Sequence, residues 1–144
     1  MLFNKGDKIN NYTVAFQLKK GSYAEDYRVK NEVGKTLFLK LINYSHLNRN
    51  QIDDNGHVIE IEIAKRLNHH NLCKYVDSGS IMINGGQCSY IATEYVSSET
   101  LSQKIIRDRE LSVYEIKVIA KSVLSALQYQ IGRASCRERV SNYV

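Results

Sequence analysis

The chain has 144 residues, of which 43% are hydrophobic and 24% are charged, and its net charge of +5 is too small to predict a nucleic-acid partner. No apolar stretch approaches the ~20 residues that cross a bilayer, and the N-terminus lacks the apolar run of a secretory signal. Three cysteines without a close pair are typical of reduced thiols, so we expect a cytoplasmic protein with no membrane or nucleic-acid partner.

Short β-rich runs separated by Gly and Asn occupy about the first two thirds of the chain. Strands are predicted over residues 11–20, 24–31, 35–42, 74–83 and 88–96. The last two flank Asn84-Gly85-Gly86, and Asn-Gly between apolar runs predicts a tight hairpin because both residues accept a positive φ. These runs predict a five-stranded antiparallel sheet.

The segment over residues 57–68 fits two different templates. Ile59, Ile61 and Ile63 alternate with glutamates, as in a half-buried strand. Ile59, Ile63 and Leu67 also fall on one face of a helix. Periodicity alone therefore leaves the segment undecided between strand and helix.

The last third of the chain is predicted to be helical. Thr100-x-x-Gln103 and Ser112-x-x-Glu115 are capping boxes, in which side chains bind the free N–H groups of a first turn. A stripe of apolar residues at helical spacing then follows: Ile116, Ile119, Ala120, Val123, Leu124 and Leu127. Strands, one helix among them and helices after them indicate the α+β class. The polar, arginine-rich run over residues 131–144 does not continue the stripe, and we expect it to be a non-native tail that adds little to the core.

Four short motifs follow one another along the chain. A turn at Gly21-Ser22 joins the first two strands, and Lys40 lies inside the apolar third strand. Glu60 stands seven residues before an exit that reads Leu67-Asn68-His69-His70-Asn71-Leu72, and Thr93-Glu94-Tyr95-Val96 ends the last strand. In this order the motifs resemble the N-terminal lobe and hinge of the protein kinases, and most of all the Ser/Thr type.

The resemblance implies a role for each motif. It makes residues 57–68 a helix, from which Glu60 would pair with Lys40, and Lys40 would orient the phosphates of ATP. Thr93 would be the gatekeeper, and the backbone of Glu94 and Val96 would face the adenine. The candidate catalytic residues are thus Lys40 and Glu60, and the candidate nucleotide-binding residues are Gly21, Ser22, Lys40, Thr93, Glu94 and Val96.

Several residues depart from the family's pattern. Asp26 stands where kinases place a valine over the adenine, and Phe38 stands where they place a small alanine. Lys19 and Ala24 replace two of the three glycines in the phosphate-binding loop. These changes predict weak or absent ATP binding, and they keep open a non-catalytic, pseudokinase-type binding module. A small basic nucleic-acid binder comes last, since no clustered basic face is evident.

The catalytic motifs of the resembled family are missing from the chain, which contains neither H-R-D nor D-F-G. The resemblance therefore implies an N-lobe with hinge over residues 1–96 and the first two helices of the C-lobe over residues 97–130. It implies a piece that is inactive alone, whereas the intact kinase would transfer the γ-phosphate of ATP to protein substrates with Mg²⁺. No metal site is expected, because the adjacent His69 and His70 should point apart. The oligomeric state is left open.

Overall fold

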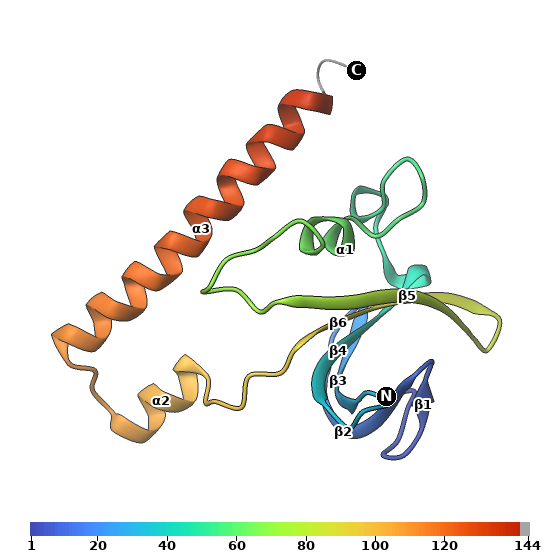
Figure 1. The fold of residues 1–144 in the computed structure, drawn as a ribbon, viewed down its shortest axis with the longest axis horizontal. Coiled ribbons are helices and arrows are strands. Elements are labelled where there is room, and N and C mark those ends of the chain that lie inside the picture. Colours follow the sequence, from blue (N-terminus) through green and yellow to red (C-terminus); the bar gives the residue numbers. More distant parts are fainter. Residues whose placement is uncertain (142–144) are drawn as a thin grey trace. The chain divides into compact units, whose positions relative to one another are not determined.

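The computed structural model describes residues 1–141, with side chains described as far as Gly132. The strands of the described part are β1 (Lys8–Ile9), β2 (Tyr12–Lys20), β3 (Ala24–Lys30), β4 (Thr36–Asn43), β5 (Tyr75–Ile83) and β6 (Gly86–Glu94). The helices are η1 (Tyr44–His46) and η2 (Arg49–Gln51), both of 3-10 type, and α1 (Ile59–Ala64), α2 (Leu101–Asp108) and α3 (Val113–Ser141). The α+β class expected from the sequence is confirmed (Figure 1).

The chain divides into two compact units. The first consists of residues 1–67 and 73–95 and holds the whole sheet together with α1. The second consists of residues 68–72 and the chain from residue 96 onward, and it holds α2 and α3.

The sheet has six antiparallel strands in the order β1-β2-β3-β4-β6-β5, so the prediction of five strands is wrong by one. The additional strand, β1, has two residues and pairs with β2 through Ile9 and Tyr12. Asn10, with φ +49°, makes the reversal between them. A strand of two residues is too short to show an alternation of apolar and polar side chains. Its pairing with β2 is held instead by the burial of Ile9, which is fully enclosed.

The sheet is strongly curled, which brings its two edges together. Tyr12 of β2 donates a hydrogen bond of 2.7 Å to Asp77 of β5, although three strands separate β2 from β5 in the sheet order. The rings of Tyr12 and Tyr90 meet edge to face with 5.7 Å between their centroids. The curled sheet encloses the main core, whose largest fully buried side chains include Tyr27, Leu37, Leu39 and Val29.

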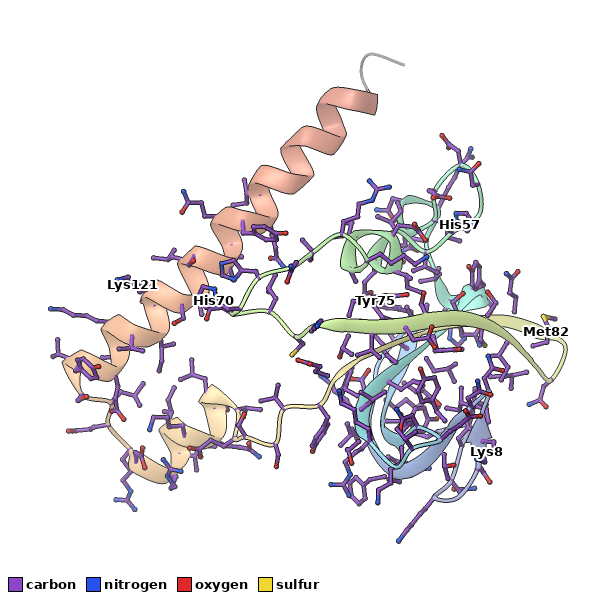
Figure 2. All side chains as sticks on the ribbon, viewed as in Figure 1. Lys8, His57, His70, Tyr75, Met82 and Lys121 are labelled. Carbon is purple, nitrogen blue, oxygen red and sulfur yellow. The ribbon has the colours of Figure 1, made fainter. Side chains whose placement is uncertain are left out.

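The hairpin between β5 and β6 follows the prediction. Asn84 has φ +49° and Gly85 has φ +79°, and Ile83 pairs with Gly86 across the turn. The turn therefore consists of two residues, and the predicted third turn residue, Gly86, already begins β6. Met82 lies exposed near this end of the hairpin (Figure 2).

Gly79 is required by the close approach of Tyr90 from the neighbouring strand. A Cβ on Gly79 would lie 2.6 Å from the Tyr90 hydroxyl oxygen and 2.8 Å from two ring carbons. Because Tyr90 is 5% exposed and packed in the core, its ring has little room to move. We expect Gly79→Ala to lower the free energy of unfolding by about 1–3 kcal/mol in a denaturant titration. Gly86→Ala is the matched control, since its nearest contact would be a carbonyl oxygen at 3.4 Å, and an equal loss in both variants would contradict the prediction.

The segment that periodicity left undecided forms α1, as the resemblance implied, but the helix is shorter than predicted. At its start, Val58 forms an isolated antiparallel bridge with Ile52, and the N–H of His57 binds the Asp53 carboxylate. This extended backbone holds the chain out of the helix until Ile59. At its end, the N–H of Leu67 binds the carbonyl three residues earlier, which tightens the last turn instead of extending the helix.

Both predicted capping boxes open the helices of the second unit. Thr100 and Gln103 cap α2 reciprocally, and Ser112 and Glu115 exchange the same pair of bonds before α3. The backbone of α3 continues through Ser141, beyond the predicted end near residue 130. We expected residues 131–144 to add little to the core. Almost all of their side chains lie outside the described residues, so this stays a prediction.

Much of the apolar stripe of α3 faces solvent within the described chain. Exposure is 45% or more for four of its members: Ile116, Val123, Leu124 and Leu127. The loop at residues 68–72 lies against the same helix, where the N–H of Asn68 binds the Tyr129 hydroxyl at 3.0 Å and the Asn71 amide binds the Ser122 carbonyl at 3.1 Å. None of the helices in the described part of the chain is long and apolar enough to cross a membrane.

Candidate functional site

The site is built on one face of the first unit's sheet, where cross-strand neighbours set which side chains meet. Asp26, Lys40 and Ile91 are paired in register on β3, β4 and β6. Directly opposed residues on antiparallel strands project from the same face of a sheet. The period of two along each strand then places Phe38 on that face beside Lys40. The face therefore presents Lys40, an acid and a large ring side by side.

Lys40 and Glu60 form an ion pair that joins β4 to α1. The Lys40 Nζ donates to Glu60 Oε1 at 2.6 Å, with the lysine side chain 23% and the glutamate side chain 43% exposed. The neighbouring acid, Glu62, pairs with Lys65 instead, at 2.9 Å. The pair expected from the sequence is thus present with the expected glutamate, whereas the roles of both residues stay predictions.

Packing beneath α1 holds Glu60 in place. A second core cluster joins the start of α1 to the sheet, and its buried members are Ala24, Ile42, Val58, Ile61 and Ile91. Ile61 is 5% exposed, so the helix is anchored through the residue next to Glu60. A change that loosens this cluster would separate the two charges without touching either one.

The environment of Lys40 keeps its ammonium charged. Partial burial lowers the pKa of Lys40, because the charged form loses solvation. The hydrogen bond and the charge of Glu60 oppose this effect, the Tyr23 hydroxyl adds to them, and the net pKa of Lys40 is raised. The site therefore offers a fixed positive charge at neutral pH.

Asp26 places a second carboxylate beside the same lysine. Burial raises the pKa of Asp26, while the charges of Lys40 and Lys19 lower it and that of Glu60 raises it, and the net pKa is raised. The folded protein therefore disfavours the charged form of this carboxylate. An acid of this kind on the candidate ligand-binding face costs stability at neutral pH.

Asp26→Asn is expected to raise the melting temperature at pH 7 by up to a few degrees. The folded-state pKa of Asp26 lies above its unfolded value of 3.8, so the cost is fully present above the folded pKa and fades as the pH falls toward 3.8. Melting curves from pH 7 to pH 4 should therefore converge for the two proteins. The exposed Asp54→Asn serves as the control. A gain in melting temperature of Asp26→Asn that stays constant across this pH range would contradict the raised pKa of Asp26.

Aromatic side chains and one guanidinium occupy the region that the resemblance assigns to adenine. Phe38 is paired with Arg28 on one side and with Thr93 on the other. The Arg28 guanidinium lies 5.4 Å from the ring centre of Phe16 and 5.9 Å from that of Tyr95, which is within cation–π range. Motif comparison did not single out Arg28, although its place two residues after Asp26 puts it on the same face.

The remaining predicted residues lie at the ends of strands. Gly21 is exposed in the turn before β3, where its N–H binds the Ala24 carbonyl at 2.8 Å. Ser22 is also exposed, and no described residue accepts a hydrogen bond from its N–H. Thr93 is half-buried in β6, and the N–H of Glu94 binds the Lys74 carbonyl at 2.9 Å. Val96 is 59% exposed and begins the next stretch of the second unit. The structure brings Lys40 and Glu60 into contact, and among the described residues no hydrogen bond or ion pair joins another candidate to that pair.

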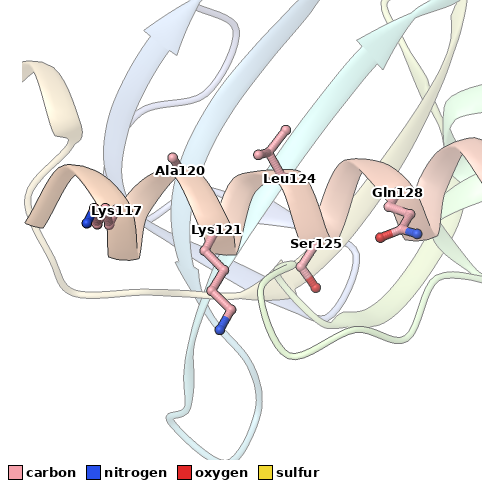
Figure 3. Close-up of a pocket in the computed structure, with 6 residues that line it drawn as sticks. All are labelled: Lys117, Ala120, Lys121, Leu124, Ser125 and Gln128. Atoms are coloured by element: carbon pink, nitrogen blue, oxygen red, sulfur yellow. The ribbon is translucent and has the colours of Figure 1, made fainter. Parts of the chain in front are cut away.

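Nothing in the described part of the chain gathers three His, Cys, Asp or Glu side chains around a metal position. His69 and His70 do not point apart as predicted but stack with 4.5 Å between ring centroids, because His69 turns to meet Ser125 at 3.2 Å and Tyr129. A separate depression lies along α3, as Figure 3 shows, and none of the predicted site residues lines it. Its lining residues are Lys117, Ala120, Lys121, Leu124, Ser125 and Gln128.

Comparisons with known proteins bear on the same residues. The sequence profile of the protein kinase domain family matches residues 12–132. A probable serine/threonine-protein kinase of Dictyostelium discoideum is 28% identical over 123 residues, which is 83% of this chain but 16% of that protein. A mutant form of the Mycobacterium tuberculosis PknI kinase domain is 27% identical with a TM-score of 0.68, over 93% of this chain and 53% of that one. PpkA-294 in its apo form, 15% identical with a TM-score of 0.52 over 72% and 42% of the two chains, shares the fold alone. The chain spans about half the length of the similar solved domains.

Proposed function

Because this chain belongs to the protein kinase domain family, we propose that its first unit is the ATP-binding lobe of a Ser/Thr-type protein kinase. The intact family member would transfer the γ-phosphate of ATP to hydroxyl groups of proteins. The Ser/Thr assignment is supported by the named relative, which is a probable serine/threonine-protein kinase. In this proposal the lobe and hinge occupy residues 1–96, the start of the second lobe occupies residues 97–130, and residues 131–144 are a non-native tail.

The observation that carries the proposal is the ion pair between Lys40 and Glu60. A lysine that was only structural on an edge strand would extend its amine into water. Lys40 instead lies on β4, which has strand neighbours on both sides, and its Nζ is held 2.6 Å from a carboxylate on the adjoining helix. Such a cation, charged and fixed in direction, is suited to bind a phosphate oxygen.

The phosphate end of the site fits ATP better than the adenine end. Lys40 supplies a positive charge, and the N–H of Ser22 has no acceptor among the described residues. Bound ATP would supply the phosphoryl group, and Lys40 and the turn at Gly21 and Ser22 would orient its phosphates. At the adenine end, Phe38 reduces the space, and Asp26 adds a carboxylate that repels the anionic nucleotide. Together, the two ends of the site support weak binding of ATP.

The proposed hinge binds through backbone atoms. In the proposal Thr93 limits the depth of the base pocket, and the Glu94 carbonyl and the Val96 backbone receive the edge of the adenine. Because backbone groups are independent of side-chain identity, the exposed side chains of Glu94 and Val96 are compatible with this role. Mg²⁺ and the protein substrate would belong to the intact kinase.

A second candidate function is a pseudokinase-type binding module without catalysis. It is favoured by the replacement of two loop glycines with Lys19 and Ala24, and by the raised pKa of Asp26 on the ligand face. In this case Lys40 and Glu60 would be retained for the stability of the lobe.

A nucleotide titration with a thermal readout tests the proposal. ATP at ten times its Kd adds about 1.4 kcal/mol to the stability of the folded state, which gives a measurable rise in melting temperature. We expect this rise in the unsubstituted chain and in Lys65→Met, and its loss in Lys40→Met. Lys65 is the control because it makes a comparable ion pair away from the site. An equal rise in all three proteins would contradict the proposed role of Lys40, and no rise in any of them would favour the pseudokinase-type module.

A further inference from the structure

Tyr23 contributes a third polar group to the Lys40–Glu60 pair. Its hydroxyl accepts a hydrogen bond from Lys40 Nζ at 3.3 Å and donates one to Glu60 Oε2, also at 3.3 Å. The ammonium lies 5.1 Å from the centre of the Tyr23 ring, within the range of cation–π attraction. Side chains from the turn before β3, from β4 and from α1 therefore form one closed set.

Two contacts hold Tyr23 in this position. Its ring packs, half-buried, against the second core cluster, to which α1 contributes Ile61 and β4 contributes Ile42. Its carbonyl accepts a hydrogen bond of 3.1 Å from the N–H of Asn43 at the end of β4. The ring thus lies where the turn, the sheet and the helix meet, and its hydroxyl reaches both charges of the pair.

We propose that Tyr23 is a positioning residue whose hydroxyl holds Lys40 and Glu60 together in the ligand-free lobe, which we call its closing role. An anionic ligand then binds Lys40 by displacing the tyrosine hydroxyl. The displacement rests on the proposed nucleotide function, whereas the closing role does not. An ammonium has three N–H donors, of which Glu60 and Tyr23 engage two, so a phosphate gains a second bond to Lys40 only by taking the donor that Tyr23 occupies. A phosphate oxygen offers a stronger, charge-assisted bond than a neutral hydroxyl does.

The distances indicate which member of the set leaves first. The bond between Lys40 and Glu60 measures 2.6 Å, and both bonds of the Tyr23 hydroxyl measure 3.3 Å. The short bond joins two charged groups, whereas the two long bonds involve a neutral hydroxyl, and hydrogen bonds between charged groups are the stronger kind. An arriving anion would therefore break the contact with Tyr23 and leave the ion pair intact, so that Glu60 continues to hold Lys40.

The charged and titratable groups around Lys40 define what a substitution should do. Glu60 faces it from α1, Asp26 from β3 and Tyr23 from the turn, while Ile91 on β6 is apolar. The bond with the Tyr23 hydroxyl is among the causes that raise the pKa of Lys40. Its removal should lower that pKa, so that the neutral amine, which is the nucleophile, forms at lower pH.

The experiment measures how fast an acetylating reagent modifies Lys40 in the full chain, across pH and without nucleotide, with each lysine resolved by mass spectrometry. In Tyr23→Phe, the loss of one hydrogen bond should speed the labelling of Lys40 by about threefold to tenfold and shift its pH profile to lower pH. Tyr44→Phe is the matched control, since Tyr44 packs on the same cluster but bonds to Gly56 and Ser89. Glu60→Gln should also speed labelling, which shows that the assay senses the pair.

A second arm adds inorganic tripolyphosphate or ATP and measures protection of Lys40 from the reagent. Tyr23→Phe should reach half-maximal protection at a lower concentration than the unsubstituted chain. Faster labelling in Tyr23→Phe without protection by either anion would uphold the closing role of Tyr23 and defeat the nucleotide function. Equal labelling rates and pH profiles in Tyr23→Phe, Tyr44→Phe and the unsubstituted chain would overturn the proposal.

Discussion

This chain alone is expected to transfer no detectable phosphate from ATP to a protein or peptide acceptor. Phosphoryl transfer requires Mg²⁺ on the phosphates and a carboxylate that orients the attacking hydroxyl. The sequence contains neither H-R-D nor D-F-G, which carry those acids in the family. In the proposed site, Lys40 with the turn at Gly21 would supply only part of a phosphate clamp. The measurement is incubation with labelled ATP, Mg²⁺ and a generic acceptor protein.

Two acids in the described part of the chain, Asp77 and Asp108, are held by other contacts. Asp77 accepts a hydrogen bond of 2.7 Å from Tyr12 within the curled sheet. Asp108 binds Arg107 and Lys104 at the end of α2, and these bonds hold the pKa of its carboxyl well below the usual range. Phosphate incorporation that survives repurification and disappears in Lys40→Met would show that the catalytic groups have been misplaced. Incorporation that Lys40→Met leaves unchanged would come from a contaminating kinase.

Leu39→Ala should cause a large loss of stability. Leu39 is 0% exposed on β4 and packs in the main core, directly between Phe38 and Lys40 in the chain. Truncation of a buried leucine costs about 2–5 kcal/mol, because it loses apolar burial and leaves a cavity. A domain with about 5–15 kcal/mol of total stability would be partly unfolded by such a loss. Urea titration followed by circular dichroism measures it.

Leu18→Ala is the matched control, since it removes the same atoms from a side chain that is 40% exposed on β2. Its cost should stay near or below about 1 kcal/mol, as for most exposed positions. Because β4 carries Leu39 inward and Lys40 outward, Leu39→Ala should also speed the labelling of Lys40. If Leu39→Ala lost as little stability as Leu18→Ala, the core would not enclose β4 as described.

The elements with strong local signals were predictable from the sequence. The Asn84-Gly85 turn forms because both residues accept positive φ, and the boxes at Thr100 and Ser112 begin helices because their partners lie three residues away. Each of these signals depends on neighbours within a few residues, so the local sequence contains all the information needed.

Other features were decided by the tertiary structure, because they depend on contacts between distant segments. Strand β1 is too short for any pattern and exists because β2 binds it. The segment at residues 59–64 satisfied strand and helix templates equally, and its helix is anchored by Ile61 packing with sheet residues far away in the sequence. The contact of Tyr23 with Lys40 and Glu60 spans 17 and 37 residues. Such contacts form only when the fold brings their partners together, so no local pattern in the sequence could have predicted them.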